Sequence, residues 1–330
     1  MAPMWITLHK LTILLRSSDG RIRRLWQRLF QGWVHSDGPR TGEPHICLEL
    51  ERVSALPSLP DAPPFFTDEH TQPEGAGVLS VYQDADDFVT LAFQQGAAVS
   101  VSLYSGTQDH APVASGLITD AALEHGCLED ITFTSLAPLL RRRNYYLVHA
   151  FAASKDGRAL LIVGPSGSGK TTTGLSLLLH GWKLLANDVL LLEERPDGVY
   201  ALPTPGEIGI RPGTLELLPP LRSWLGRRQP IDGAYTLSGA EAVRGKWSEA
   251  VPIAAVCFPE IEKREVSVAH PEKAAVVLAR LMEESVDRWD RAMLSRHMSL
   301  LQTVSQQAQA YTLRLGADVI ELPQLLACLI

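Results

Sequence analysis

A short segment of the chain combines glycines, a lysine and hydroxyl residues at a spacing that suits phosphate chemistry. It reads Gly164-Pro165-Ser166-Gly167-Ser168-Gly169-Lys170-Thr171 and satisfies the pattern G-x-x-x-x-G-K-[ST]. Glycines let successive backbone N–H groups point into one concavity that accepts phosphate oxygens. Lys170 would add a charge beside the β- and γ-phosphates, and Thr171 a hydroxyl ligand for Mg²⁺. The segment, extended to Thr172, therefore predicts a binding site for a nucleotide with Mg²⁺.

Asp188 follows an apolar strand predicted over residues 182–186 and lies only 18 residues after Lys170. A carboxylate at the end of a strand beside a phosphate loop can hold the metal or accept the proton of a substrate hydroxyl. The alternative is an aspartate that serves only a turn between two strands. We predict Asp188 to be a catalytic residue and a metal ligand.

Four charged residues further along the chain are also candidates. Glu207 follows a proline-rich turn, and we predict it to be a second metal ligand; the alternative is a solvated loop acid. Arg244 and Lys246 flank a glycine before an apolar strand, where a basic loop could close on the transferred phosphoryl group. Arg211, before Pro212, could act in the same way. For all three basic residues the alternative is an ordinary solvated turn.

Local signals predict the elements that position these residues. Apolar runs at 146–153 and 158–163 flank a Lys-Asp-Gly turn, which predicts a β-hairpin leading into the loop. Residues 171–180 are helical in pattern and end before Gly181, a position that requires left-handed backbone. Further elements are expected as a strand at 251–258, helices at 273–282 and 291–307, a strand at 310–315 and a closing helix at 318–330.

Composition sets bounds on the class of protein. The chain has 330 residues, 45% of them hydrophobic and 20% charged, which excludes intrinsic disorder. Four widely separated cysteines exclude a disulfide scaffold and predict reduced thiols in the cytoplasm. A net charge of −7 argues against general binding of nucleic acid. Charges also interrupt the apolar residues near the N-terminus, so neither a membrane span nor a signal peptide is expected.

The charge is unevenly distributed along the chain. Residues 1–40 hold seven Lys and Arg against two Asp, whereas residues 53–140 hold twelve acids and no Lys or Arg. We predict a basic amphipathic segment of one or two helices over 1–40, an acidic β-rich domain over 41–143 and a domain with the phosphate loop over 144–330. The basic segment is expected to dock on the acidic domain; the alternative is that the acidic face binds a basic peptide.

The acidic domain carries short β patterns separated by proline-rich turns. These patterns predict an antiparallel sheet and, after it, one short helix whose first turn contains Pro138. The expected strands are residues 46–53, 78–82, 88–93 and 98–104, and the expected helix is residues 135–143.

His149 lies 21 residues before Lys170, on the first strand of the predicted hairpin. This spacing, the loop, the stretch 180–188 and the proline-rich residues 202–214 together resemble the C-terminal catalytic domain of HPr kinase/phosphorylase. Relatives of that family include kinases of lasso-peptide gene clusters. The resemblance covers residues 139–218 and, less closely, the rest of the chain. It implies an α/β fold with a P-loop core of the HPr-kinase/PEP-carboxykinase-like type, preceded here by a β-rich N-terminal domain.

The resemblance also implies roles for individual residues. Asp188 would take the proton of the acceptor hydroxyl, Lys170 would clamp the phosphates, Thr171 would bind Mg²⁺, and His149 would orient Asp188 or share its proton. The chain departs from the family at Asn187 and Thr172, where the family has acids. It also lacks the downstream glycine-rich signature of the bifunctional enzyme, so the reverse, phosphate-removing reaction is not expected.

We therefore expect an HPr-kinase-like serine kinase that uses ATP and Mg²⁺. The favoured acceptor is a serine hydroxyl of a small protein or ribosomally made peptide. The alternatives are a non-catalytic ATP-binding regulatory or accessory module and a small-molecule kinase. The oligomeric state stays open, with a homo-oligomer among the alternatives.

Overall fold

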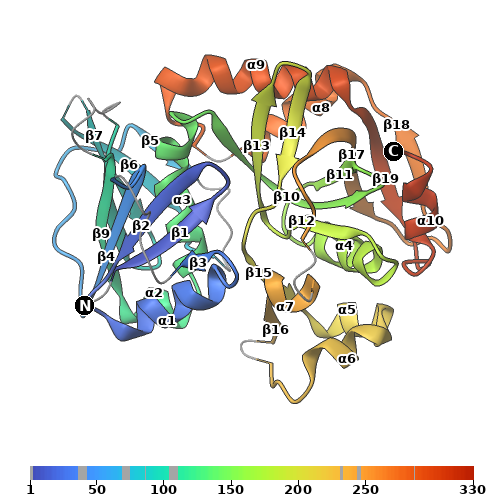
Figure 1. Cartoon of the computed structure of the whole chain (residues 1–330), viewed down its shortest axis with the longest axis horizontal. Helices are drawn as coiled ribbons and strands as arrows, with labels where there is room; N and C mark the ends of the chain where they lie inside the picture. The colour runs from blue at the N-terminus through green and yellow to red at the C-terminus, as the bar shows by residue number, and fades with distance from the viewer. Residues whose placement is uncertain are drawn as a thin grey trace. The chain divides into compact units, whose positions relative to one another are not determined.

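The computed structural model describes residues 3–35, 43–68, 75–85, 87–103, 111–230, 233–243, 247–285 and 287–330 of the chain. The chain divides into two compact units, Met1–Arg143 and Asn144–Ile330 (Figure 1). None of the helices in the described ranges combines the length and the apolar composition needed to cross a membrane.

The described part of the N-terminal unit is built on a nine-stranded sheet with the order β3-β1-β2-β4-β9-β8-β7-β6-β5. The strands are β1 (Met4–Leu8), β2 (Leu11–Arg16), β3 (Val34–His35), β4 (Ile46–Val53), β5 (Phe66–Asp68), β6 (Leu79–Ala85), β7 (Phe88–Phe93), β8 (Ala97–Ser102) and β9 (Val113–Thr119). The four predicted strands correspond to β4, β6, β7 and β8, although Tyr104 lies outside the described residues. The antiparallel prediction is wrong for two pairs, because β2–β4 and β4–β9 are parallel.

Residues 4–16 form a β-hairpin, so the helix predicted there is wrong. β1 and β2 pair antiparallel around His9, whose φ is 57°. Met4, Ile6 and Leu8 are buried and alternate with less buried residues, which is the period of a strand rather than of a helix. The later part of the basic segment is helical as predicted. It forms α1 (Gly20–Leu29), which begins where Asp19 accepts hydrogen bonds from two backbone N–H groups.

The described part of the N-terminal unit contains two more helices, α2 (Asp120–Glu124) and α3 (Leu128–Arg141). α3 begins before the predicted residue 135, so Pro138 lies inside the helix rather than in its first turn. Ile131, Leu136 and Leu139 are fully or almost fully buried, and this apolar face extends the helix on both sides of the proline. Burial therefore offsets the backbone hydrogen bond that a proline inside a helix cannot make.

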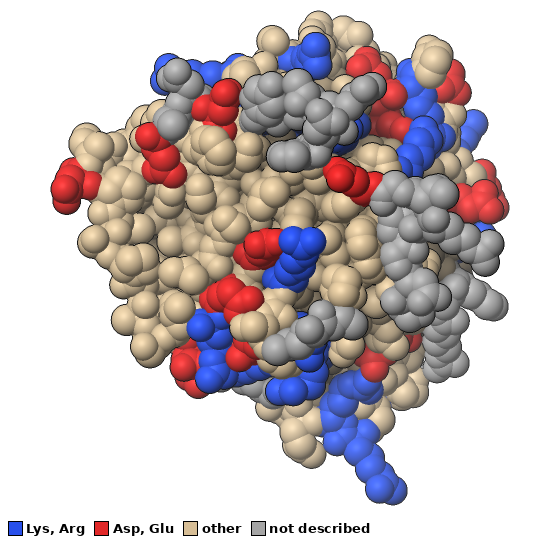
Figure 2. All heavy atoms as spheres, turned by 60° about the vertical axis from the view of Figure 1, so that its left-hand side comes forward, with Lys and Arg blue, Asp and Glu red and all other residues tan. Residues whose placement is uncertain are grey.

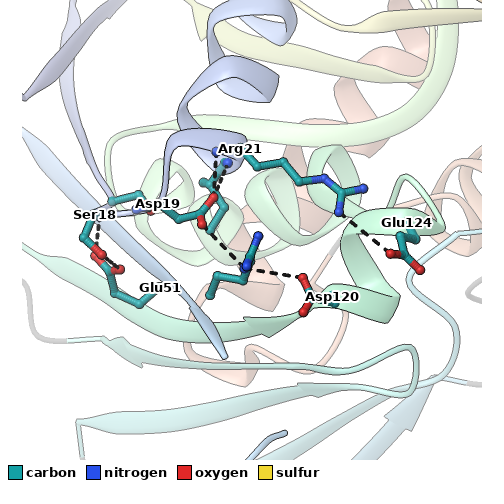
Figure 3. Close-up of polar contacts among 9 residues, drawn as sticks. Ser18, Asp19, Arg21, Glu51, Asp120 and Glu124 are labelled. Atoms are coloured by element: carbon teal, nitrogen blue, oxygen red, sulfur yellow. Dashed lines mark hydrogen bonds and ion pairs between the residues drawn. The ribbon is translucent and has the colours of Figure 1, made fainter. Parts of the chain in front are cut away.

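α1 docks on the Lys- and Arg-free part of the chain mainly through apolar contacts. Ile22, Trp26 and Phe30 are completely buried, and the indole N–H of Trp26 donates a 3.0 Å hydrogen bond to Thr132 Oγ1 in α3. By contrast, the ion pair between Arg21 and Glu124 spans 4.0 Å and is largely exposed (Figure 3). The docking predicted from opposite charges is present, but hydrophobic burial is its main cause.

Asp19 and Asp120 are further joined by Arg52 of β4, whose Nε lies 3.5 and 3.4 Å from their carboxylates. Ser18 is bound to Glu51 of the same strand through both its N–H and its hydroxyl (Figure 3). Figure 2 shows one face of the molecule on which acidic side chains are scattered among uncharged residues and often lie beside basic ones. On that face the acids do not form one continuous acidic surface.

The described part of the C-terminal unit is built on an eight-stranded sheet with the order β11-β10-β13-β14-β17-β19-β18. In addition, β12 pairs with β10, and β11 pairs with β17. The strands are β10 (Tyr145–Lys155), β11 (Arg158–Val163), β12 (Lys183–Ala186), β13 (Val189–Arg195), β14 (Gly198–Leu202), β17 (Val251–Ile261), β18 (Val268–Pro271) and β19 (Gln309–Leu315). β11 is parallel to β17, and β17 is parallel to β19. The carboxyl ends of these three strands therefore meet at one edge of the sheet.

Two hydrophobic cores lie on the two sides of this sheet. In β11, Leu160 and Ile162 belong to one core, whereas Leu161 and Val163 belong to the other. The first core includes residues of α4 (Lys170–Leu179) and α10 (Leu322–Ala327), and the second includes residues of α8 (Ala274–Glu283) and α9 (Arg291–Gln307) (Figure 1). The unit is an α/β structure in which helices cover both sheet faces.

A small excursion follows β14. It contains a two-stranded sheet of β15 (Glu207–Ile210) and β16 (Tyr235–Ser238), with the helices α5 (Pro212–Leu217), η1 (Pro219–Leu221), α6 (Arg222–Leu225) and α7 (Gly239–Val243).

Most elements of this unit were predicted at nearly their observed positions, including the hairpin of β10 and β11 and the helix α9. The closing helix is shorter than predicted and begins only at Leu322. Its expected first residue, Asp318, instead accepts hydrogen bonds from the backbone N–H and the hydroxyl of Ser267. These bonds tie residues 316–318 to the β17–β18 connection, so the helix starts later.

Candidate nucleotide and phosphoryl-transfer site

The glycine-rich segment forms the connection between β11 and α4. Gly167 and Gly169 have φ values of 77° and 101°, which side-chain-bearing residues rarely adopt. Gly169 is also the N-cap of α4, and a Cβ atom there would lie 2.7 Å from Leu315 Cδ1. The backbone conformation favours glycine at this position, and a Cβ atom would also have to displace the end of the Leu315 side chain. The loop thereby brings the backbone to the N-terminal end of a helix, where anions are stabilised.

Lys170 is the first residue of α4, and only 6% of its surface is exposed. Its Nζ donates hydrogen bonds to the carbonyl oxygens of Gly164, at 2.6 Å, and Pro165, at 3.1 Å. The ammonium group is therefore folded back over the loop. Burial lowers its pKa, although the negative charges of Asp188 and Glu284 act in the opposite direction.

The hydroxyl residues around Lys170 lie at the first turn of α4. Thr171 and Thr172 are half-buried, and Thr172 Oγ1 lies 2.9 Å from the hydroxyl of Thr214 in α5. In the loop itself, the buried Ser168 Oγ has no hydrogen-bond partner within the described part of the chain. Together with the glycine conformations, this buried hydroxyl fits a loop that surrounds phosphate oxygens.

His149, on β10, lies between two carboxylates. Its Nε2 is 2.8 Å from Asp188 Oδ1, and its Nδ1 is 2.8 Å from Glu284 Oε2. Asp188 stands between β12 and β13, both of which pair with β10. The Asp188 side chain keeps 41% of its surface exposed, whereas His149 and Glu284 keep 21% and 16%. Asp188 is thus the member of the group that a substrate can reach.

The charges in this group shift one another's pKa. Burial alone would lower the pKa of the His149 imidazole, but the charge of Asp188 and the hydrogen bonds to Asp188 and Glu284 raise it to about 9. For Asp188, burial favours the protonated form, yet His149 and the charge of Lys170 bring its pKa below the ordinary value. At neutral pH the arrangement is a carboxylate beside an imidazolium, close enough to Lys170 for their charges to interact.

The predicted metal ligands come from three places in the unit. Asn187 Nδ2 donates a 2.9 Å hydrogen bond to the carbonyl oxygen of Glu207, so the start of β15 lies beside the residue before Asp188. The oxygen chemistry of Thr171, Asp188 and Glu207 suits Mg²⁺. Among the described residues, however, no cluster of three or more His, Cys, Asp or Glu could hold a metal by itself. Mg²⁺ here would need phosphate and water oxygens to complete its ligand set.

The basic candidates are only partly described. Arg211 precedes α5 as its N-cap residue and is exposed. It lies three residues before Thr214, whose hydroxyl contacts Thr172. Arg244 and Lys246 lie outside the described residues.

Neither a known family model nor a curated protein sequence matches this chain. Among solved structures, it is similar to the HPr(Ser) kinase/phosphatase from Coxiella burnetii. The similarity is distant. The two are 13% identical, with a TM-score of 0.29, over 56% of this chain and 92% of the other. A likeness at this level assigns neither a family nor an activity.

Glu284 is the member of the site that sequence analysis missed. It directly follows α8 and lies 135 residues after His149, and its neighbours in sequence carry no recognisable motif. Main-chain pairing with β10 holds Glu284 beside His149. His149 N–H donates to the Glu284 carbonyl at 2.8 Å, and Val148 forms a β-bridge with Ser285. The contact depends on the return of the chain to β10 after α8, which no local pattern predicts.

Proposed function

We propose that this chain is an ATP- and Mg²⁺-dependent kinase that transfers the γ-phosphoryl group to a serine hydroxyl of a small protein or peptide. The observation that supports this proposal is the pairing of Asp188 with His149 in electrostatic reach of Lys170 of the glycine-rich loop. A reachable carboxylate next to a phosphate-binding loop has the chemistry needed to act on a hydroxyl acceptor.

In this proposal the loop and Lys170 bind the nucleotide. Backbone N–H groups of residues 166–170 and the N-terminal end of α4 bind the phosphate oxygens, and the Lys170 ammonium turns from the loop carbonyls toward the β- and γ-phosphates. Mg²⁺, held by Thr171 with Asp188 and Glu207, would neutralise charge on those phosphates. Such transfer asks mostly for positioning and charge neutralisation, which these groups supply.

Asp188 is the proposed base. The acceptor oxygen forms a bond to the γ-phosphorus while the bond to the ADP oxygen breaks, and the hydroxyl proton passes to the Asp188 carboxylate. The imidazolium of His149 holds the carboxylate in one orientation through the Nε2–Oδ1 hydrogen bond. Because Asn187 has an amide, it cannot take over the proton if Asp188 is changed.

The test is phosphoryl transfer to peptides encoded by neighbouring genes, incubated with ATP and Mg²⁺ and measured by intact mass. A modified peptide gains about 80 Da per phosphate. Asp188→Asn should abolish transfer and keep nucleotide affinity, whereas Lys170→Ala should weaken both. Asp156→Asn, in the exposed hairpin turn where φ is 50°, is the matched control, because asparagine tolerates this conformation.

The outcomes separate the proposal from its alternatives. Near-normal turnover of Asp188→Asn would remove Asp188 as the base. ATP binding without transfer to any peptide or protein would indicate an accessory module, and transfer only to small hydroxylated metabolites would indicate a small-molecule kinase.

A further inference from the structure

We infer that Glu284 is a positioning residue that holds the His149 imidazole doubly hydrogen-bonded against Asp188 and thereby orients the base. The inference rests on the proposed function of Asp188 and adds a residue that neither the loop pattern nor the spacing to His149 indicates. Glu284 acts through His149 and is not proposed to touch the substrate.

The geometry around the imidazole gives the first argument. Both ring nitrogens of His149 lie 2.8 Å from a carboxylate oxygen, Nε2 from Asp188 and Nδ1 from Glu284. An ionised carboxylate accepts hydrogen bonds and cannot donate them. A neutral imidazole has one N–H and could satisfy only one of these neighbours, whereas the imidazolium donates to both. The arrangement therefore selects the charged ring.

The backbone gives the second argument. His149 N–H donates to the Glu284 carbonyl at 2.8 Å, and the adjacent Val148–Ser285 bridge joins the same two segments. The side-chain contact is thus supported by main-chain pairing on one side of β10. On the other side, Ala150 N–H donates to the Asp188 carbonyl at 2.9 Å. Both carboxylates are anchored to β10 next to the histidine that they share.

Burial gives the third argument. The Glu284 side chain is 16% exposed and that of His149 is 21% exposed, so water competes little for their hydrogen bond. A buried carboxylate is stable only when it is paired, and the imidazolium pairs it. The charges of Lys170 and Glu284 also interact. Removing Glu284 leaves the imidazole with Asp188 as its remaining carboxylate partner in this group.

The test compares Glu284→Gln with Glu283→Gln, the neighbouring exposed glutamate at the last residue of α8. Proton–nitrogen NMR of nitrogen-15-labelled protein at neutral pH, with the His149 signals identified by their absence in His149→Gln, reports the hydrogen bond at each ring nitrogen without any acceptor. In the wild type both ring N–H protons should be observed, because each is held by a carboxylate and exchanges slowly with water. In Glu284→Gln the Nδ1–H signal should be lost or move upfield, because a neutral amide replaces the charged acceptor. Glu283→Gln should leave both signals unchanged.

The kinetic readout is the separate effect on kcat and on KM for phosphoryl transfer. Glu284→Gln should lower kcat by about 10-fold while KM for ATP stays within about twofold, because the base is less well oriented and the nucleotide site is unchanged. A role in structure alone would change KM for ATP and the melting temperature together with kcat. If Glu284→Gln does not fold, Glu284→Asp serves instead, because the shorter carboxylate should weaken the contact and keep the charge.

The two proposals fail in different ways. An Nδ1–H signal that is the same in Glu284→Gln or Glu284→Asp as in the wild type overturns the role of Glu284, whatever the activity. A signal that changes in a protein that transfers phosphate to no acceptor keeps Glu284 as the partner of His149 and overturns the kinase proposal. A kcat that keeps its wild-type value although the signal changes overturns the orientation of the base by Glu284.

Discussion

His149 Nε2 lies 2.8 Å from Asp188 Oδ1, although the two residues are 39 positions apart in the sequence. The backbone fixes the same pair, since Ala150 N–H donates to the Asp188 carbonyl at 2.9 Å. Strand pairing and side-chain hydrogen bonding therefore agree on one placement of the carboxylate. A base held from two directions in this way does not need the substrate to orient it.

The first prediction concerns this pair. His149→Gln should reduce kcat for phosphoryl transfer by about 10- to 100-fold, because the carboxylate loses a charged hydrogen-bond donor but remains available as a base. Asp188→Asn should cost more, up to about 10⁴-fold, so that transfer is no longer detected by intact mass. Steady-state kinetics with a peptide acceptor measures both. Equal losses in the two variants would mean that His149 itself takes part in proton transfer.

The second prediction concerns stability and pH. The pKa of His149 is about 9 in the folded chain and 6.5 in its ordinary state, so the folded state binds the proton more tightly. The resulting stabilisation, roughly 3 kcal/mol at most, is fully present below pH 6.5 and is lost as the pH rises through about 9. Urea unfolding at pH 6, 8 and 10, chosen to bracket this window, should show the loss in the wild type and not in His149→Gln. If the free energy of unfolding changed equally with pH in both proteins, the raised pKa of His149 would be contradicted.

The third prediction concerns Lys170. Lys170→Ala should weaken ATP binding by about 10- to 100-fold, which corresponds to a lost charge-assisted contact with phosphate. Isothermal titration with ATP and Mg²⁺ measures the change. Lys183→Ala, at an exposed position at the start of β12, is the control and should bind ATP as the wild type does. Unchanged affinity in Lys170→Ala would exclude the phosphate-clamp role.

The fourth prediction compares two glycines of the loop. Both Gly167→Ala and Gly169→Ala introduce a side chain at positive φ, which costs about 1 kcal/mol. Only at Gly169 does the new Cβ also meet another atom, Leu315 Cδ1 at 2.7 Å, whereas the space at Gly167 is open. Thermal unfolding without nucleotide should therefore show a larger fall in melting temperature for Gly169→Ala than for Gly167→Ala. An equal fall in melting temperature in the two variants would mean that the Leu315 side chain moves aside without a cost in stability.

The fifth prediction concerns the docking of α1. Trp26→Ala should lower the free energy of unfolding by about 3 to 5 kcal/mol, because a fully buried indole and its hydrogen bond to Thr132 are lost. Arg21→Ala should change it by less than about 0.5 kcal/mol, because its ion pair with Glu124 is long and largely exposed. Denaturant unfolding of both variants would decide between apolar and ionic docking, and a larger effect of Arg21→Ala would reverse our interpretation.

Local sequence patterns were sufficient to predict the helix and strands around the glycine-rich loop. The hairpin before it, the helix after it and the left-handed Gly181 at φ 84° all depend on residues within a few positions of one another. Glycine conformation, helix caps and apolar periodicity act over that range. The same reasoning failed at residues 4–16, because apolar residues mixed with basic ones suit both a helix and an edge hairpin, and the sheet beside them selects the strand.

By itself, the sequence determined the residue types that could do chemistry and the elements that carry Lys170, His149 and Asp188. The tertiary structure decided which of these groups meet. Glu284 lies 135 residues from His149, and it meets the histidine because α8, which it directly follows, packs on one face of the sheet. Contacts of that range follow from burial of whole elements, so the third member of the carboxylate–imidazole–carboxylate group could be found only in the folded chain.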